Sequence, residues 1–319
     1  MTKLALLVGI DGYPSSPLAG CVNDAERVTE LLARNHDNSP NFECRALVAP
    51  AGAVTTVTRP VLRQAVEELF NRPVDVALFY FSGHGTVNNL GGYLVTQDAA
   101  RYDEGLSMAH VLATANNSPA KERIVILDCC HSGAMGQLPA IDNDTAMLRE
   151  GVSVLSACRE SETSLETNGG GLFTTLVCDA LSGGAADVCG KVTTAGIYTY
   201  VDEALGGWDQ RPLFKTHIAK LVPLRNCTPA VDPKILRMLP QYFKTPKDHY
   251  VLDPSYEPTE EPRHEEHEMI FGHLQKLRAA RLVDPVGEEH LYFAAINSKS
   301  CRLTALGVFY WHLANSGKI

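Results

Sequence analysis

The sequence predicts an α/β fold for residues 1–225, a three-layer αβα sandwich with a mostly parallel central sheet, followed by a small C-terminal α+β module. In the first part, apolar runs alternate with stretches whose apolar residues recur at helical spacing. Runs that are apolar at almost every position are typical of strands covered on both faces, and their alternation with helices is typical of parallel sheets. After residue 225 the alternation stops and prolines become frequent.

Five runs have the composition of strands. They are Lys3–Ile10, Val74–Phe81, Glu122–Cys129, Gly151–Ala157 and Leu213–Ile218. Four other stretches predict helices, because their apolar residues return every three or four positions. They are residues 23–35, Phe173–Leu181, Ile197–Leu205, and a stretch that has Thr58 as its N-cap and Pro60 in its first turn.

The last third of the chain differs in composition, with many prolines and an acidic stretch. Seven prolines and the acidic stretch Glu257–Glu268 predict that residues 226–264 are a linker or a wrapping arm. Residues 265–319 regain a pattern, with a helix expected at Met269–Leu282, a strand at His290–Ile296 and a helix at Leu303–Leu313. This order of elements predicts a winged-helix-like module.

The charge of that module bears on its partners. Residues 229–319 contain 11 Lys and Arg against 12 Asp and Glu, a net charge of −1, and the whole chain has a net charge of −9. Because nucleic-acid binding relies on a basic surface, we expect no nucleic-acid partner. Docking of an activator protein, or self-inhibition, fits this charge better.

The composition excludes several classes of protein. With 45% hydrophobic and 20% charged residues, the chain is neither disordered nor a disulfide scaffold. No apolar run approaches the ~18 residues that a membrane helix needs. We therefore expect a cytoplasmic protein without membrane contact. The nine cysteines form no CxxC pair, so the sequence predicts neither a zinc site nor a disulfide framework.

Two short motifs each follow directly on a predicted strand. Ser82–Gly85 has the sequence SGHG, and Cys130–Gly133 has the sequence CHSG. Because sites in open α/β sheets form at the carboxyl ends of the strands, we expect His84 and Cys130 to meet there. A cysteine beside a histidine is the arrangement of a thiol nucleophile and its base.

These residues resemble the caspase-like cysteine peptidases, and among them the metacaspase and orthocaspase branch. The resemblance covers residues 1–225. It rests on SGHG, on DCCHSG at Asp128–Gly133, on GCVNDA at Gly20–Ala25, and on the later runs SACRESETS and GGLFTTLVCDAL. His84 precedes Cys130 by 46 residues (130 − 84), close to the ~50 of caspase-type enzymes. The resemblance implies a caspase-like fold.

The resemblance and the chemistry together suggest a role for each residue. Cys130 is the expected nucleophile, and His84 would activate it or protonate the leaving amine. The N–H groups of Gly85 and Cys130 are candidates for the oxyanion hole. Cys129 is the alternative nucleophile, but its side chain should point to the opposite face of the strand. The family pattern also places the nucleophile directly before His-Ser-Gly.

The resemblance implies an acidic pocket for the P1 residue of the substrate. Caspases, which cut after Asp, have Gln two residues before the nucleophile, where this chain has Asp128. In metacaspase-like enzymes this Asp lines the pocket together with the CxND run, here Cys21 to Asp24. Two carboxylates repel an Asp side chain and attract Arg or Lys, and a bidentate fit favours Arg. Capping of a helix N-terminus is an alternative role for Asp24.

The resemblance also bears on calcium binding and on self-processing. Many metacaspases need calcium, but the candidate acidic residues do not have the spacing of a ligand loop, so we expect no metal or other cofactor. These candidates are Asp98, Asp103, Glu104, Asp142 and Asp144. The segment 134–150 is expected to be an exposed loop with Arg149 as its only basic residue. Arg149 is therefore the candidate for self-processing, and the alternative is that it only caps or solvates the loop.

The sequence thus predicts a cysteine endopeptidase that cuts protein substrates after Arg or Lys with a Cys-His dyad. The resemblance to bacterial orthocaspases suggests a regulated proteolytic cascade in stress response or phage defence. One alternative is a non-enzymatic regulator, with a DNA- or protein-binding winged helix and a caspase-like scaffold. Another is an acyl transferase or other thiol hydrolase on the same fold. The presence of both His84 and Cys130 favours the peptidase.

Overall fold

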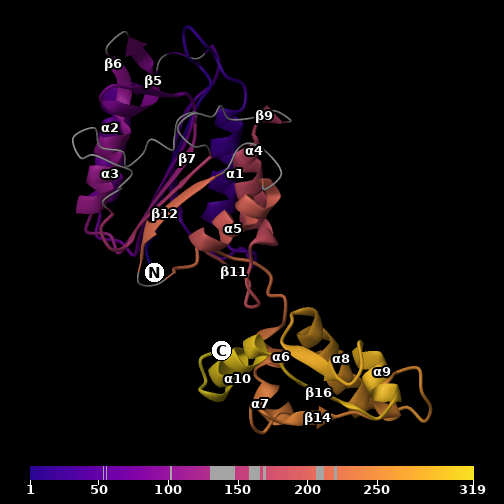
Figure 1. Ribbon diagram of the computed structural model, residues 1–319. Coiled ribbons are helices and arrows are strands. Elements are labelled where there is room, and N and C mark those ends of the chain that lie inside the picture. The colour runs from indigo at the N-terminus through magenta and orange to yellow at the C-terminus, as the bar shows by residue number, and fades with distance from the viewer. Residues whose placement is uncertain are drawn as a thin grey trace. The chain divides into compact units, whose positions relative to one another are not determined.

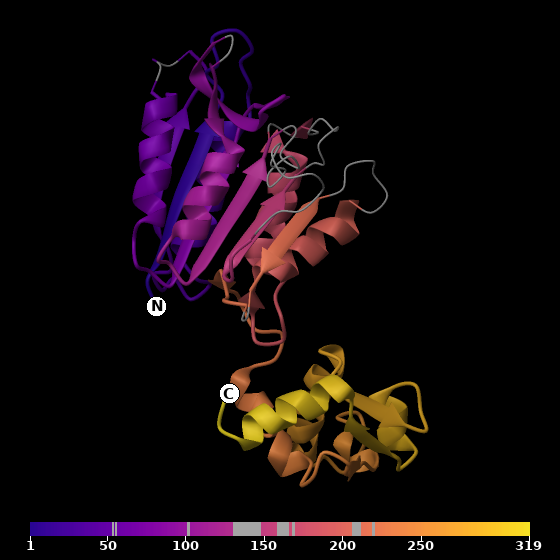
Figure 2. The same cartoon turned by 60° about the vertical axis from the view of Figure 1, so that its left-hand side comes forward.

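The computed structural model describes residues 1–319 apart from 53, 55, 101–102, 130–147, 158–165, 168–169, 206–211 and 219–220. The chain forms two compact units (Figure 1, Figure 2). The first comprises residues 1–186 and 191–227, and the second comprises residues 187–190 and 228–319. The first unit ends close to the boundary expected at residue 225.

Six strands form the main sheet of the first unit, among the residues that the structure describes. Their spatial order is β12 (Leu213–His217), β8 (Val152–Ser156), β7 (Glu122–Asp128), β3 (Val76–Ser82), β1 (Lys3–Ile10) and β2 (Glu43–Ala49). Neighbouring strands are parallel, except that β12 runs antiparallel to β8 at one edge. The predicted α/β class with a mostly parallel sheet is confirmed.

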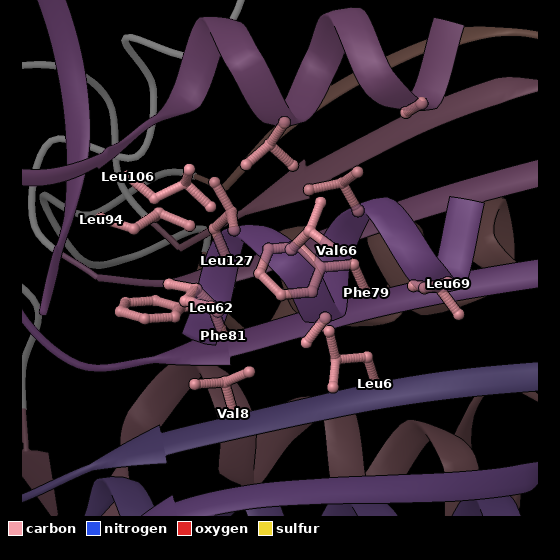
Figure 3. Close-up of a cluster of buried hydrophobic side chains, with 14 of the residues drawn as sticks. Leu6, Val8, Leu62, Val66, Leu69, Phe79, Phe81, Leu94, Leu106 and Leu127 are labelled. Carbon is pink, nitrogen blue, oxygen red and sulfur yellow. The ribbon is translucent and has the colours of Figure 1, made fainter. Parts of the chain in front are cut away.

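Helices cover both faces of this sheet (Figure 1). One face packs against α1 (Cys21–Ala33), α4 (Leu172–Asp179) and α5 (Thr194–Leu205), and the other against α2 (Arg59–Phe70) and α3 (Met108–Asn117). A hydrophobic core lies on each face of the sheet. Successive residues of a strand point to opposite faces and so contribute to the two cores in turn. Leu6 and Val8 face α2 (Figure 3), whereas Ala5 and Leu7 belong to the core under α1.

The edge strand β2 was absent from the predicted strands. Most of its positions are partly or fully exposed, so it has no continuous apolar run. Smaller elements complete the unit. They are the antiparallel sheet β4 (Gly85–Asn88), β5 (Gly91–Ala100) and β6 (Asp103–Ser107), the pairs β9 (Glu166–Thr167) with β10 (Gly170–Gly171) and β11 (Lys191–Val192) with β13 (Arg225–Asn226), and a π-helix at Ala180–Gly184 that extends α4.

The carboxyl ends of three central strands align at one edge of the sheet. Ser82 at the end of β3 pairs in register with Gly9 of β1 and with Asp128 of β7. The Gly83 N–H also donates to the Asp128 carbonyl at 3.3 Å. The ends of β1, β3 and β7 are therefore neighbours, although they are far apart in the sequence.

The second unit has its own hydrophobic core and a three-stranded antiparallel sheet in the order β14–β16–β15. Its elements are α6 (Pro233–Leu236), α7 (Leu239–Tyr242), β14 (His249–Val251), a 3-10 turn at Pro254–Tyr256, α8 (Glu265–Ala279), β15 (Val283–Val286), α9 (Leu291–Ile296), β16 (Ser300–Leu303) and α10 (Ala305–Asn315).

Residues 226–264 were expected to be a linker or a wrapping arm, and a large part of this stretch contributes to the core instead of linking two units. Phe243 and Leu252 are fully buried in the same cluster as Phe271 and Leu274. Three of the seven prolines that suggested a linker instead lie in the first turns of short helices, for example Pro233 in α6, where the missing N–H of proline needs no partner.

The strand expected at His290–Ile296 is also wrong, since these residues form α9. Leu291, Ala294 and Ala295 are its buried residues, and their spacing is helical. Aromatic residues in a short run favoured a strand, but Tyr292 and Phe293 are exposed. The winged-helix-like module rested on this strand, and it stays a prediction. Across the described part of the chain, no helix has the length and apolarity to span a bilayer.

Candidate active site

His84 lies just beyond β3, at the aligned strand ends. Its ring nitrogen Nε2 is 2.8 Å from the Ser16 carbonyl oxygen. Because a carbonyl oxygen can only accept a hydrogen bond, Nε2 carries the proton. In the neutral imidazole, Nδ1 is then the basic nitrogen. The loop after β1 therefore sets the tautomer that a general base needs.

Tyr13, from the same loop, holds His84 in place. Its hydroxyl accepts the His84 N–H at 3.0 Å and donates to the Val95 carbonyl at 3.2 Å. Its ring packs on the imidazole, with 4.6 Å between ring centroids. A methyl group at Gly83 would overlap the Tyr13 hydroxyl, so glycine is needed there. Tyr13 is buried, and this burial raises the pKa of its hydroxyl.

We expect Tyr13→Phe to lower kcat about tenfold with KM nearly unchanged, because losing the acceptor of a partly buried N–H costs about 1–3 kcal/mol. Steady-state kinetics on a single peptide substrate would measure this. Tyr292→Phe is the matched control, since Tyr292 is exposed on α9 of the second unit. An unchanged kcat in Tyr13→Phe would show that the hydroxyl does not position His84.

Of the two adjacent cysteines, Cys129 and Cys130, the structure describes only the first. Cys129 is 0% exposed and belongs to the core that packs against α2 and α3, together with Val125 and Leu127. Asp128, its neighbour, bonds to the helix α4 on the other face. Cys130 lies outside the described residues. The Cys129 side chain is thus part of that core, and the choice of Cys130 as nucleophile stays a prediction.

Asp128 is buried at the end of β7, with 5% of its surface exposed. Its Oδ2 accepts the Thr174 hydroxyl at 2.6 Å and the Thr174 N–H at 3.3 Å, in the first turn of α4. Because that hydroxyl donates to Asp128, Tyr80 must donate to Thr174 in their 2.6 Å contact. A helix N-terminus and a relay of hydroxyls thus support this carboxylate.

Asp24 lies in the first turn of α1, and only 1% of it is exposed. Its Oδ2 accepts the Gly171 N–H at 2.8 Å, and its Oδ1 accepts no hydrogen bond from the described residues. Asp24 does not cap α1. Asp11 does, by accepting the N–H groups of Cys21 at 2.8 Å and Val22 at 3.3 Å. The capping alternative for Asp24 is therefore wrong.

Asp24 and Asp128 share one covering segment. A methyl group at Gly170 would overlap Asp24, and one at Gly171 would overlap Asp128. The strand β10 thus touches both carboxyl groups. Burial raises the pKa of Asp24 to about 7, with Asp128 and Asp11 adding repulsion and Arg27 opposing it. A buried carboxyl with a pKa near neutrality is typical of functional sites.

The other predicted site residues lie at the same edge. Cys21 is the first residue of α1. Its burial raises the pKa of its thiol, and a hydrogen bond with Ser82 opposes this shift. Gly85 begins β4 directly after His84 and pairs with Leu94. Its role in an oxyanion hole stays a prediction.

Arg149 is exposed, but its backbone N–H and carbonyl are both hydrogen-bonded. Its N–H donates to the Asn116 side chain at 2.9 Å, and its carbonyl accepts the Val152 N–H at 3.2 Å. The next carbonyl, of Glu150, accepts from the buried guanidinium of Arg123 at 2.7 Å. A peptidase binds its substrate as an extended strand. The bond after Arg149 must leave this turn before it can be cut.

Self-processing after Arg149 is therefore expected to be slow in the native protein and faster in Asn116→Ala, which removes one of these ties. Gel electrophoresis and mass spectrometry of the fragments would follow it over time. Arg149→Ala and Cys130→Ala should both remain uncut. A cut that persists in either variant contradicts self-processing at this bond.

Two of the five acidic residues named as calcium candidates bond to neighbouring residues. Asp98 accepts from the Arg59 N–H at 2.9 Å and from the Thr96 hydroxyl at 2.7 Å, and Asp103 pairs with the Arg59 guanidinium at 2.5 Å. Asp142 and Asp144 lie outside the described residues. Within the described ranges, no group of three metal-ligating side chains is found. The expected absence of a calcium site stays a prediction.

Sequence patterns alone missed Tyr13, Ser16 and Thr174. Each acts on a residue far along the chain, such as Tyr13 on His84 and Thr174 on Asp128. The signal available for the first two was the loop Asp11–Pro17, which follows a buried strand at the carboxyl edge, where sites form.

Known proteins share this arrangement of elements. A model of the caspase domain matches residues 2–223. Metacaspase-3 of Trypanosoma cruzi is 27% identical over 225 residues, which are 59% of this chain and 60% of that protein. The chain thus spans about three-fifths of the length of this curated relative.

Two solved structures have the same fold. Protein GSU0716 from Geobacter sulfurreducens superposes with a TM-score of 0.53 and 16% identity, over 72% of this chain and 100% of that one. Caspase-1 from Spodoptera frugiperda superposes with a TM-score of 0.51 and 11% identity, over 71% of this chain and 90% of that one. The family model covers well over half of the sequence and spans the first unit almost entirely. The chain belongs to the caspase-domain family.

Proposed function

We propose that this protein is a cysteine endopeptidase that cuts peptide bonds after Arg or Lys, with Cys130 as nucleophile and His84 as its base. The observation that carries the substrate class is the pair of buried carboxyl groups, Asp24 and Asp128, beneath one glycine strand at the edge where His84 lies. Membership of the caspase-domain family supports the reaction type.

The reaction follows from the tautomer of His84. Nδ1 takes the proton of the Cys130 thiol, and the thiolate adds to the scissile carbonyl carbon. Backbone N–H groups, those of Gly85 and Cys130 among the candidates, stabilise the resulting oxyanion. His84 then gives its proton to the leaving amine, and a thioester remains on Cys130. Water, deprotonated by His84, hydrolyses the thioester and frees the carboxylic acid and the thiol.

The acid pair supplies specificity by charge. An Asp side chain at P1 would meet two carboxyl groups of its own sign, whereas a guanidinium can bond to both. Asp24 Oδ1, which has no hydrogen-bond donor among the described residues, is available to this guanidinium. Because Gly170 lies against Asp24 Oδ1 and the Gly171 N–H is bonded to Oδ2, the strand β10 must shift for a side chain to enter.

A peptide panel tests the proposal. The peptides differ only at P1, which is Arg, Lys, citrulline or Asp, and each is tested with calcium and with a chelator. Arg and Lys peptides should be cut at least about 100-fold faster than the Asp peptide, because juxtaposed like charges cost several kcal/mol. Cys130→Ala should cut none of them. Preference for Asp would overturn the acidic pocket.

The setting of this activity is proposed from the resemblance to bacterial orthocaspases, namely a regulated stress or phage-defence cascade. The second unit supports a docking role for an activator protein, since it has a separate core and exposes Tyr292, Phe293 and Phe309.

A further inference from the structure

Arg27 is a cation placed beside the acid pair by the same helix that carries Asp24. It lies one turn further along α1, and its Nη1 is 3.7 Å from Asp24 Oδ1. Asp24 Oδ1 has no hydrogen-bond donor among the described residues, so Arg27 is its nearest described counter-ion. A distance of 3.7 Å is too long for a hydrogen bond.

Arg27 has two further neighbours in this arrangement. Its Nη1 donates to the Thr175 hydroxyl of α4 at 3.3 Å. Gly170 lies against both groups, because a methyl group built there would stand 3.6 Å from Nη1 and would overlap Asp24 Oδ1. About a third of the Arg27 side chain is exposed. The pair is thus a loose one, with a buried anion and a cation that can move out to solvent.

We propose that Arg27 is the resting counter-ion of Asp24 and a specificity-determining residue, which an arginine at P1 displaces when it binds. This inference rests on the proposed cleavage after arginine. Arg27 compensates the buried charge while no substrate is present. A substrate guanidinium supplies the same charge with the hydrogen bonds that Arg27 does not make. When the substrate binds, its guanidinium replaces that of Arg27 beside Asp24. Only a cationic P1 side chain can make this replacement.

The electrostatic surroundings of Asp24 agree with this role. Burial, Asp128 and Asp11 raise its pKa, whereas the hydrogen bond from the Gly171 N–H and the charge of Arg27 lower it. The titratable groups that face Asp24 come from several elements; they are Asp11, Cys21 and Arg27 around α1, Tyr80 on β3, Asp128 on β7 and Cys178 on α4. Arg27 is the cation in this set.

The kinetic test compares Arg27→Gln with wild type on two peptides that differ only in arginine or citrulline at P1. At pH 8.5, Arg27→Gln should lower KM for the arginine peptide about fivefold, since repulsion between two guanidinium groups is removed. KM for the citrulline peptide and both kcat values should stay the same. The pH at which arginine preference appears should rise by about half a unit, because Asp24 loses the cation that favours its ionisation.

Two controls accompany this test. Arg27→Lys keeps the charge and should behave as wild type. Arg45→Gln removes the same charge at a surface pair with Glu68 and should change neither KM. A higher KM for the arginine peptide in Arg27→Gln, or equal KM changes for both peptides, would overturn the displacement.

A second measurement needs no substrate. In the Cys130→Ala background, Arg27→Gln should lower Tm by about 2 °C more at pH 8.5 than at pH 5.5, because the counter-ion matters only while Asp24 is ionised. In a triple variant that also carries Asp24→Asn, this pH-dependent part should vanish. A loss of Tm that is equal at both pH values would overturn the counter-ion role. A wild-type enzyme that cuts the arginine and citrulline peptides equally would overturn the proposed P1 preference, and with it the displacement of Arg27. The Tm measurement would still decide whether Arg27 is the counter-ion of Asp24.

Discussion

Cys130→Ala is expected to abolish peptide cleavage altogether. Without the thiol, His84 has no nucleophile to activate, and the reaction loses its covalent intermediate. Loss of such a nucleophile typically lowers the rate by several orders of magnitude, about 10⁶-fold in well-studied hydrolases. Progress curves with an arginine peptide at high enzyme concentration would measure the residual rate. The variant should keep the circular dichroism spectrum and Tm of the wild type.

Cys129→Ala is the matched control for that variant. The Cys129 side chain is fully buried against α2 and α3, so its loss should cost about 1 kcal/mol of stability. Cleavage at a temperature well below Tm should remain close to that of wild type. If Cys129→Ala is inactive while folded and Cys130→Ala is active, the assignment of the nucleophile is wrong.

Asp24→Asn is expected to lower kcat/KM for arginine peptides about 10- to 100-fold, because a hydrogen bond to a charged group is worth about 1.5–3 kcal/mol. The Asn side chain has the same shape, and its oxygen can still accept the Gly171 N–H. Cleavage of the citrulline peptide should change much less, since it brings no charge. Matched peptides at pH 8 would measure both effects.

The same variant should gain stability relative to wild type as pH rises. The pKa of Asp24 is about 7 in the folded protein, against 3.8 for an ordinary Asp. Between these values the folded state keeps a proton that the unfolded state has released, so wild-type stability falls with rising pH across this window. Asn does not titrate. The Tm of Asp24→Asn minus that of wild type should therefore grow from pH 4 to pH 7 and then level off.

Asp37→Asn is the matched control, because Asp37 is exposed and bonds only to its own turn through Ser39, as far as the described residues show. It should affect neither arginine cleavage nor the pH dependence of Tm in this window. An Asp24→Asn enzyme with full arginine preference would remove Asp24 from the specificity pocket. A difference in Tm that does not vary with pH would contradict the raised pKa.

Buried strands and their carboxyl ends could be predicted because a strand covered on both faces has an almost unbroken apolar run. Both β3 and β7 have this pattern, and the residues just beyond them include His84. The edge strand β2 could not be predicted in the same way, because solvent covers much of it. In the second unit, prolines in the first turns of short helices looked like those of a linker.

The contacts that complete the site could not be predicted, because they join distant segments. Thr174 of α4 supports Asp128, and Gly171 binds Asp24, through hydrogen bonds that depend on how α4 packs against the sheet. A local sequence pattern contains no information on which distant segments come into contact. The positions of Asp24 and Asp128 at one edge follow from strand order, but their burial beneath β10 does not.

Covalent trapping of the nucleophile tests both the catalytic thiol and the acidic pocket. A peptide that ends in an arginine chloromethylketone should alkylate one thiol, with a bond from sulfur to the methylene carbon and loss of chloride. Mass spectrometry of wild-type protein should find the label on Cys130, and the matching aspartate reagent should label it much more slowly. Labelling confined to Cys129, or faster labelling by the aspartate reagent, would contradict a Cys130 peptidase with an acidic pocket.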